Sequence, residues 1–220
     1  MLFRSGTAGL YATAPKRLDA DALAGLVPDL VAGAQVFLAG GCGSCHAAPN
    51  ATRDTRLNLT GGQAFVSDFG TFYAPNISPD TRAGIGDWSA LDLANAMLHG
   101  TSPGGQHYYP AFPYGSYGRV SLQDIVSLHA YLMGLPAMPN ESRAHDVNFP
   151  FNIRAILGGW KLLFKSTDWV LTVAETPELE RGRSLVEALG HCAECHTPRH
   201  ILGGLQTSPW LAAAPTPRPT

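Results

Sequence analysis

Cys42-Gly43-Ser44-Cys45-His46 and Cys192-Ala193-Glu194-Cys195-His196 are two copies of one pattern, in which a histidine directly follows two cysteines three residues apart. Together they use all four cysteines of the 220-residue chain. Cysteines at this spacing lie on one side of a helical turn, and C-x-x-C-H is the pattern that attaches heme c, with the histidine as an iron ligand. The sequence therefore predicts two heme c groups, bound covalently by the four cysteines, with His46 and His196 as the proximal iron ligands.

Two other uses of paired cysteines stay open at this point. C-x-x-C pairs also form four-cysteine zinc sites and thioredoxin-like redox pairs. A zinc site would have to bring the two pairs together across the intervening chain, and neither alternative uses the histidine that follows each pair. Heme attachment is the interpretation that accounts for every residue of the pattern.

The composition is that of a folded chain, with no charge pattern for nucleic acid. Hydrophobic residues make up 45% of the sequence and charged residues 15%, which is enough for a core in one large or two small domains. The net charge of -2 and the absence of Lys and Arg runs give no basic surface. With 24 glycines, 17 prolines and little alternation of β-branched residues, the sequence predicts an all-α fold of short helices and long loops.

Helical signals surround the first pattern. Three stretches have apolar residues at helical spacing, with capping residues at their starts and glycines after their ends: 28–38, 89–98 and 121–132. Between His46 and Asp87 the sequence is poorly periodic and rich in turn residues, which predicts a loop that encloses the heme. We therefore expect a first cytochrome c-like heme domain over residues 28–139.

A second module follows a connector over residues 140–176, whose apolar segment Ile153–Phe164 is expected to pack between the modules. A helix beginning at Pro177 leads into the second pattern and predicts a second heme domain over residues 177–220. Since the sequence has 220 residues, only 24 follow His196. We expect two cytochrome c-like heme domains in tandem, the second incomplete at its C-terminus.

Residues 1–27 form an N-terminal segment without an apolar stretch long enough for a signal peptide or a membrane helix. Heme is attached to such patterns outside the bacterial cytoplasmic membrane, so an exporting segment is required. We therefore expect an export or anchor region to be missing from this segment. The expected location is the periplasm, and such an anchor would tie the protein to the membrane.

Several stretches together resemble a known family. The most distinctive are GCGSCHAAP at 41–49, APNISPD at 74–80, GIGDWS at 84–89, YPAFPY at 109–114 and CHTPR at 195–199. From Gly33 onward the chain resembles the diheme and multiheme cytochrome c subunits of membrane-bound bacterial alcohol, gluconate and aldehyde dehydrogenases. The resemblance implies a periplasmic carrier that takes electrons from a dehydrogenase subunit and passes them to quinone or another downstream acceptor.

One position departs from that family. Many relatives have a methionine in the tyrosine-proline loop as the sixth iron ligand, whereas this sequence has Phe112, which cannot bind iron. Met97, on the preceding helix, is the first candidate for the distal ligand of the first heme, although its spacing from Leu93 also fits a core residue. His107, in the glycine-rich loop, is the second candidate.

An open iron site would allow a different function. A heme enzyme, such as a peroxidase or an enzyme that oxidises sulfur compounds, is the alternative to electron transfer. The sequence offers no nucleophile with its base, no paired carboxylates and no distal acid–base group for such chemistry. We therefore expect an electron-transfer subunit without catalytic residues of its own.

Overall fold

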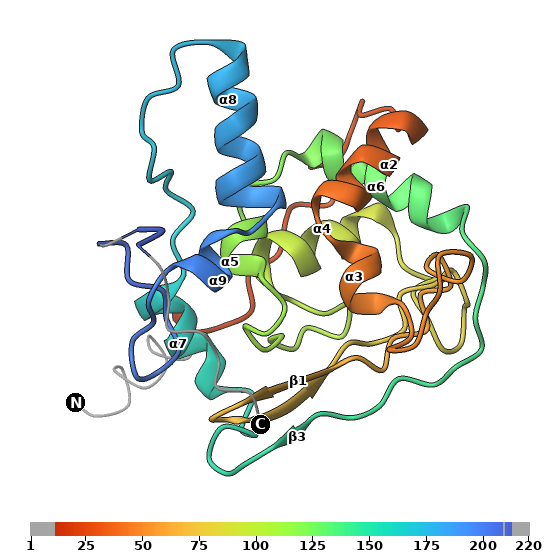
Figure 1. Ribbon diagram of the computed structural model, residues 1–220, viewed down its shortest axis with the longest axis horizontal. Helices are drawn as coiled ribbons and strands as arrows, with labels where there is room; N and C mark the ends of the chain where they lie inside the picture. Colours follow the sequence, from red (N-terminus) through yellow and green to blue (C-terminus); the bar gives the residue numbers. More distant parts are fainter. Residues whose placement is uncertain (1–11, 209, 213–220) are drawn as a thin grey trace.

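The computed structural model describes residues 12–208 and 210–212 (Figure 1). Three helices form its framework, and a small sheet lies below them in the view of Figure 1. The helices are α2 (Leu30–Ala39), α4 (Ala90–His99) and α6 (Leu122–Met133). Each of them coincides with a helix that the apolar spacing of the sequence predicts, so these predictions are confirmed.

The starts of these helices are fixed by local side chains that accept hydrogen bonds from otherwise unpaired backbone amides. Asp29 accepts from Val31 and Ala32 at 2.8 and 3.0 Å. Ser89 and Asp92 each accept a hydrogen bond from the backbone amide of the other, which is a capping box. An N-cap of this kind contributes about 1 kcal/mol, so the local sequence sets where α2 and α4 begin.

The main hydrophobic core lies between α2, α4 and α6. Its large buried side chains are Val36, Phe37, Leu93, Met97, Ile125, Leu128 and Leu132. Burying one side chain of this size stabilises the fold by about 1.5–3 kcal/mol. The two helices α2 and α6 cross closely at Gly33, where a Cβ would lie 2.2 Å from the carbonyl oxygen of Ser127. A larger residue at position 33 would push these helices apart.

The prediction of an all-α fold is wrong, because the structure contains a three-stranded antiparallel sheet. Strands β1 (Ala64–Ser67) and β2 (Gly70–Tyr73) form a hairpin inside the stretch predicted to be a loop. Strand β3 (Asp146–Val147) comes from the predicted connector and pairs with β2. Strands of four and two residues are too short to show the alternation that identifies a strand in a sequence.

The chain from residue 156 to residue 196 contains α7 (Ile156–Phe164), α8 (Pro177–Ser184), the π-helical turn η1 (Leu185–Leu189) and α9 (Ala193–His196). The helix predicted to begin at Pro177 is confirmed, and its last turn is π-helical. Ala188 and Leu189, in that turn, belong to the same buried cluster as Val36. The segment that leads into the second pattern therefore packs in the same core as α2, α4 and α6. The predicted domain boundaries remain a prediction.

None of the helices within residues 12–208 and 210–212 has the length and apolar character needed to cross a membrane. The predicted N-terminal segment, residues 1–27, includes residues 1–11, which lie outside the described residues. Residues 213–220, at the end of the predicted second heme domain, also lie outside them.

Candidate heme-attachment sites

The first cysteine pair lies on α3 (Cys42–His46), a short helix that begins where α2 ends. Gly41 separates the two helices with a left-handed backbone conformation, φ 65°, which glycine adopts without strain. The thiols of Cys42 and Cys45 are both free of disulfide bonds. Burial is the main effect that raises the pKa of Cys42 to about 12, so this thiol faces the protein interior.

The hydrogen bond made by His46 decides which of its nitrogens can bind a metal. Its Nδ1 lies 2.8 Å from the carbonyl oxygen of Pro75. Because a carbonyl can only accept, Nδ1 carries the proton and Nε2 keeps its lone pair. Burial lowers the pKa of His46, which favours the neutral ring. A neutral imidazole oriented by a carbonyl in this way is the form that binds iron through Nε2.

The second cysteine pair is more exposed than the first. Cys192 directly precedes α9, and Cys195 is the third residue of that helix. Cys192 is half-buried, whereas Cys195 and His196 are exposed. The preceding residue, His191, has a left-handed backbone conformation, φ 39°, that is uncommon outside glycine. Nδ1 of His191 lies 3.0 Å from the carbonyl oxygen of Leu189. The second pattern thus places its own histidine at the protein surface.

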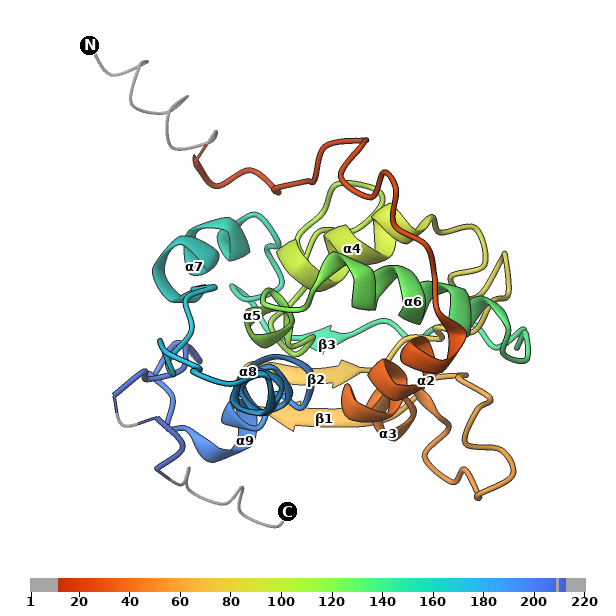
Figure 2. The same ribbon diagram turned by 90° about the horizontal axis from the view of Figure 1, so that it is seen from above.

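The two patterns, 150 positions apart in numbering, lie near each other in space. Burial raises the pKa of the Cys45 thiol, and the charge of Cys195 raises it further, so the two thiols are close enough to interact electrostatically. A Cβ on Gly41 would lie 3.8 Å from Cε1 of His191. Figure 2 shows α3 and α9 along the β1 side of the molecule. The fold therefore brings both heme-attachment sites to one region.

Tyr117, at the end of α5 (Tyr114–Tyr117), contacts the chain just before each pattern. Its hydroxyl donates a hydrogen bond of 2.8 Å to the carbonyl of Gly40. Its ring lies nearly perpendicular to that of His191, with 5.6 Å between the ring centroids. The Tyr117 side chain, which is 7% exposed, thus contacts both segments that lead into the cysteine patterns.

Phe112, at the position where relatives are expected to have methionine, belongs to an aromatic cluster. Its ring packs edge-on against Tyr108 and Tyr117, with centroid distances of 6.0 and 5.7 Å. Phe112 also packs against the main core. The aromatic cluster thus reaches from the tyrosine-proline loop to the residue that contacts both patterns.

The two candidate distal ligands lie in different surroundings. Met97 is 4% exposed and lies in the main core, against which Cys42 and Phe112 also pack. His107 has both ring nitrogens engaged: Nε2 lies 2.9 Å from the carbonyl oxygen of Thr13, and Nδ1 lies 3.0 Å from Nζ of Lys161. Iron binding by His107 would require one of these contacts to break.

The residues of both patterns fit heme c. Each pattern supplies two free thiols for thioether bonds and one imidazole for the iron, and His46 has the tautomer that iron binding requires. Across residues 12–208 and 210–212, no three side chains of His, Cys, Asp or Glu gather into a group that could hold a metal ion by themselves.

Comparison with known proteins identifies the family. No model of a protein family matches the sequence. The chain is 52% identical, over 213 residues, to a protein of Cereibacter sphaeroides named "Diheme cytochrome c-type", and the match covers 97% of this chain and 72% of that one. The chain belongs to the diheme c-type cytochromes. Heme c is therefore the cofactor of this cytochrome, and electron transfer is its general function.

Cytochrome subunits of dehydrogenases are further relatives of this cytochrome. The fructose dehydrogenase cytochrome subunit of Gluconobacter japonicus is 36% identical over 190 residues, which are 85% of this chain and 38% of that subunit. The gluconate 2-dehydrogenase cytochrome c subunit of Pantoea cypripedii is 39% identical over 166 residues, 74% of this chain and 36% of that subunit. The chain thus spans little more than a third of these subunits, and the predicted family resemblance is confirmed.

Three residues with structural roles in this cytochrome do not follow from the sequence patterns: Pro75 and Tyr117 contact a heme-attachment pattern or the chain before it, and Glu187 holds a distant segment. Pro75 acts through its carbonyl, which every residue has, so only the distinctive stretch around it gives a signal. Tyr117 acts through contacts with distant parts of the chain. Glu187 is 4% exposed, and its carboxylate accepts hydrogen bonds from the amides of Val170 and Leu171 at 2.7 and 2.8 Å. These roles depend on tertiary structure.

Proposed function

We propose that this cytochrome carries one heme c on each C-x-x-C-H pattern and relays single electrons between a donor protein and an acceptor. Heme c supplies the one-electron change between Fe(III) and Fe(II). The observation that carries the proposal is the hydrogen bond from Nδ1 of His46 to Pro75, because it leaves Nε2 as the metal-binding nitrogen. The residues proposed to hold the two groups are Cys42, Cys45 and His46 for the first, and Cys192, Cys195 and His196 for the second.

The chain's own contribution is to hold the two sites at a fixed separation. We propose heme-bearing regions over residues 28–139 and 177–220, joined by the connector 140–176. Tyr117 supports a fixed arrangement, since it contacts Gly40 on one side and His191 on the other. The close approach of Gly41 and His191, where a Cβ on Gly41 would lie 3.8 Å from Cε1 of His191, supports sites that are near enough for electrons to pass between them.

Met97 is proposed as the distal ligand of the first iron. It lies in the main core together with the residues that pack against Cys42, and its thioether is a soft ligand suited to heme iron. The contacts of both nitrogens of His107 with Thr13 and Lys161 make His107 the weaker candidate. A core position without iron binding is the competing role for Met97.

The proposed electron donor is a dehydrogenase subunit, and the proposed acceptor is quinone or a terminal acceptor protein. Support for the donor comes from relatives named as cytochrome subunits of fructose, gluconate and alcohol dehydrogenases. The proposed location is the periplasm, with membrane association through an anchoring segment or partner, since covalent attachment of heme c takes place on that side of the membrane. Docking through a small, transient interface suits repeated electron delivery.

Heme content is the first test. The protein is expressed with heme-maturation machinery and its intact mass is measured for the wild type and two paired variants, Cys42→Ala/Cys45→Ala and Cys192→Ala/Cys195→Ala. We expect two covalent hemes in the wild type and one in each variant. A wild type with fewer than two hemes, or a variant that keeps both, would contradict the proposal.

Carbon monoxide tests the distal ligand. Met97→Leu keeps the side-chain volume but removes the sulfur, so we expect its reduced spectrum to change on addition of carbon monoxide at the first heme. Met133→Leu, at the end of α6, is the matched control and should behave as the wild type. If Met97→Leu and Met133→Leu give identical spectra, Met97 is a core residue and not a ligand.

The alternative function is that of a heme enzyme with an open iron at the second pattern. The exposure of Cys195 and His196 favours it, because an exposed site leaves room for an added ligand. In that case the reduced wild type itself binds carbon monoxide, and the Cys192→Ala/Cys195→Ala variant loses that response. Turnover of peroxide or of a sulfur oxyanion by the wild type would then replace electron relay as the function.

A further inference from the structure

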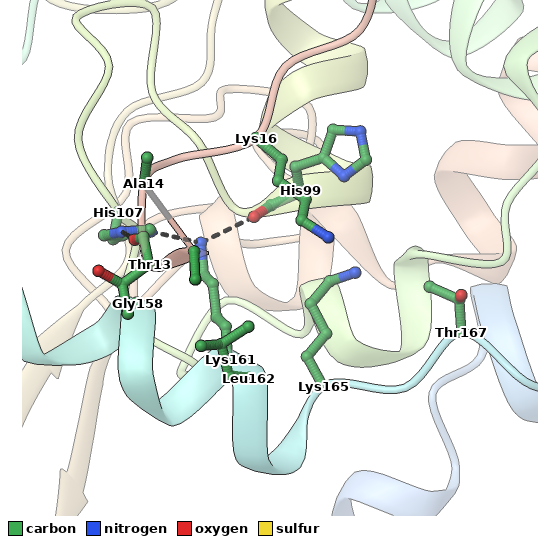
Figure 3. A pocket seen from close by; sticks show the side chains of 11 residues that line it. Thr13, Ala14, Lys16, His99, His107, Gly158, Lys161, Leu162, Lys165 and Thr167 are labelled. Carbon is green, nitrogen blue, oxygen red and sulfur yellow. Dashed lines mark hydrogen bonds between the residues drawn. The ribbon is translucent and has the colours of Figure 1, made fainter. Parts of the chain in front are cut away.

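All three lysines of this 220-residue chain surround one cavity. They are Lys16, Lys161 and Lys165. The cavity has a volume of about 220 Å³ and lies between α7 and the segment that contains Thr13 and Lys16. Figure 3 shows Lys161 and Lys165 extending from α7, with Lys16 entering from the other side beside His99. Among the described residues, no aspartate or glutamate lines this cavity.

The amine of Lys161 is held in place at the cavity by three hydrogen-bond partners. Its Nζ donates hydrogen bonds to the carbonyls of His99 and Gly100, at 2.7 and 2.8 Å. Nδ1 of His107, 3.0 Å away, is the third partner of the ammonium group. The carbonyl of Thr13 accepts from Nε2 of His107, which leaves Nδ1 as the acceptor for Lys161. These partners are neutral, and burial, with the nearby charge of Lys165, lowers the pKa of Lys161 to about 7. An anion in the cavity would favour the charged form of this amine.

Lys16 and Lys165 supply two more charges without a carboxylate partner. None of the three salt bridges in the described part of the chain involves a lysine. The pKa of Lys165 is lowered by burial, and further by the charges of Lys16 and Arg119. Like charges held together at a partly buried site repel each other, and an anion between them would remove that repulsion.

We propose that this cavity is a binding site for a small divalent oxyanion of the sulfate and phosphate class. The ammonium groups of Lys16 and Lys165 are its principal donors, and the amine of Lys161, whose charged form an anion would favour, lies behind them. The hydroxyl of Thr167, at the rim, is a further donor. The volume is below the range of about 300–1,000 Å³ that is usual for larger organic ligands, and a neutral ligand would leave the lysine charges unpaired. This site is separate from the heme-attachment patterns, so its test does not depend on electron transfer.

Isothermal titration of the heme-loaded protein with sodium sulfate and with sodium phosphate tests the site, with sodium chloride at equal ionic strength as the reference. We expect one binding event for each oxyanion and none for chloride. Lys16→Gln and Lys165→Gln should each weaken binding by about tenfold, since each removes a charge-assisted hydrogen bond. Lys165→Arg keeps the charge and should retain binding. Arg82→Gln removes the same charge from an exposed side chain elsewhere and serves as the control.

Amine labelling gives a second readout that is specific to this cavity, because the chain has no lysine elsewhere. Sulfate or phosphate should lower the labelling of Lys16 and Lys165 in peptide mass spectra, and chloride should not. The visible spectrum and the melting temperature of each variant report whether it is folded. Two results would overturn the proposal: an oxyanion titration indistinguishable from chloride, or unchanged sulfate and phosphate binding in a folded Lys16→Gln/Lys165→Gln variant.

Discussion

The hydroxyl of Tyr117 donates a hydrogen bond to the carbonyl of Gly40, two residues before Cys42. The same ring packs edge-on against His191, one residue before Cys192. Tyr117 is almost completely buried, so both contacts are shielded from water. One side chain of α5 therefore sets the position of the two heme-attachment patterns relative to each other.

Tyr117→Phe keeps the ring and removes the hydrogen bond to Gly40. The Gly40 carbonyl then loses its partner in a buried place, so the free energy of unfolding should fall by about 1–3 kcal/mol. Urea denaturation followed by circular dichroism measures this change. Tyr131→Phe is the control, because the Tyr131 ring packs on Phe37 and its hydroxyl has no hydrogen bond within the described residues. Equal losses in the two variants would show that the Gly40 bond contributes nothing.

Gly70→Ala should separate β3 from β2. Gly70 has φ 129°, and a Cβ there would lie 2.3 Å from the carbonyl oxygen of Asp146. We expect a loss of about 1–3 kcal/mol in stability and faster hydrogen exchange of the β3 amides. Gly159→Ala, on α7, has no atom within 4 Å of the added Cβ and should be neutral or stabilising by up to about 1 kcal/mol. Unchanged exchange in Gly70→Ala would contradict the pairing of β2 with β3.

Glu187→Ala should release the segment around Val170 and Leu171. The buried carboxylate accepts from both amides, so its removal leaves them unpaired at a cost of about 1.5–3 kcal/mol. Hydrogen exchange at these two amides is the direct measurement, and Glu187→Gln should give a smaller effect because one acceptor oxygen remains. Glu180→Ala removes an exposed carboxylate paired with Arg183 and should cost less than about 1 kcal/mol. Protection of both amides in Glu187→Ala would count against this role.

Asp80 predicts a specific pH dependence of stability. Its carboxylate accepts hydrogen bonds from the amides of Ala83 and Arg82, which lower the pKa of Asp80 from the ordinary value of 3.8. The folded chain therefore binds fewer protons at this residue than the unfolded chain, and the stabilisation is full above the unfolded pKa and is lost as pH falls through the folded one. The stability advantage of the wild type over Asp80→Asn should thus be present at neutral pH and disappear in acid.

Denaturant titrations of the wild type and Asp80→Asn across this range measure that difference. Asp54→Asn, at an exposed aspartate without a side-chain hydrogen bond in the described part of the chain, is the matched control. If the difference between wild type and Asp80→Asn is the same at neutral and acid pH, the ionised carboxylate does not stabilise this turn.

Local chemistry made much of the structure predictable. Asp29 and Ser89 accept hydrogen bonds from amides two and three residues ahead, so the starts of α2 and α4 can be recognised without tertiary information. The cysteine spacing is equally local. In contrast, β3 pairs with a strand 76 positions earlier, and its two residues have no periodicity of their own. The error in fold class has two sources: the β1–β2 hairpin is local but its strands are only four residues long, and β3 depends on a non-local pairing.

Non-local contacts also limit what the sequence predicts about the heme-attachment sites and the lysine cavity. The proximal role of His46 follows from its position after Cys45, but its Pro75 partner is 29 residues away and acts through a backbone atom. The convergence of Lys16 with Lys161 and Lys165 has no counterpart in any sequence pattern, since the fold alone brings position 16 beside α7. Contacts of this kind require the tertiary structure.

The order of the sheet, β1-β2-β3, also bears on how the chain is made. A chain that emerges from one end, from the ribosome or from an export channel, presents the β1–β2 hairpin before its partner from position 146 is available. During that interval one edge of the hairpin has unpaired amides and carbonyls, which can pair with another chain. A chaperone or an export factor that covers the nascent hairpin would therefore raise the yield of folded protein more than it would change the stability of the finished fold.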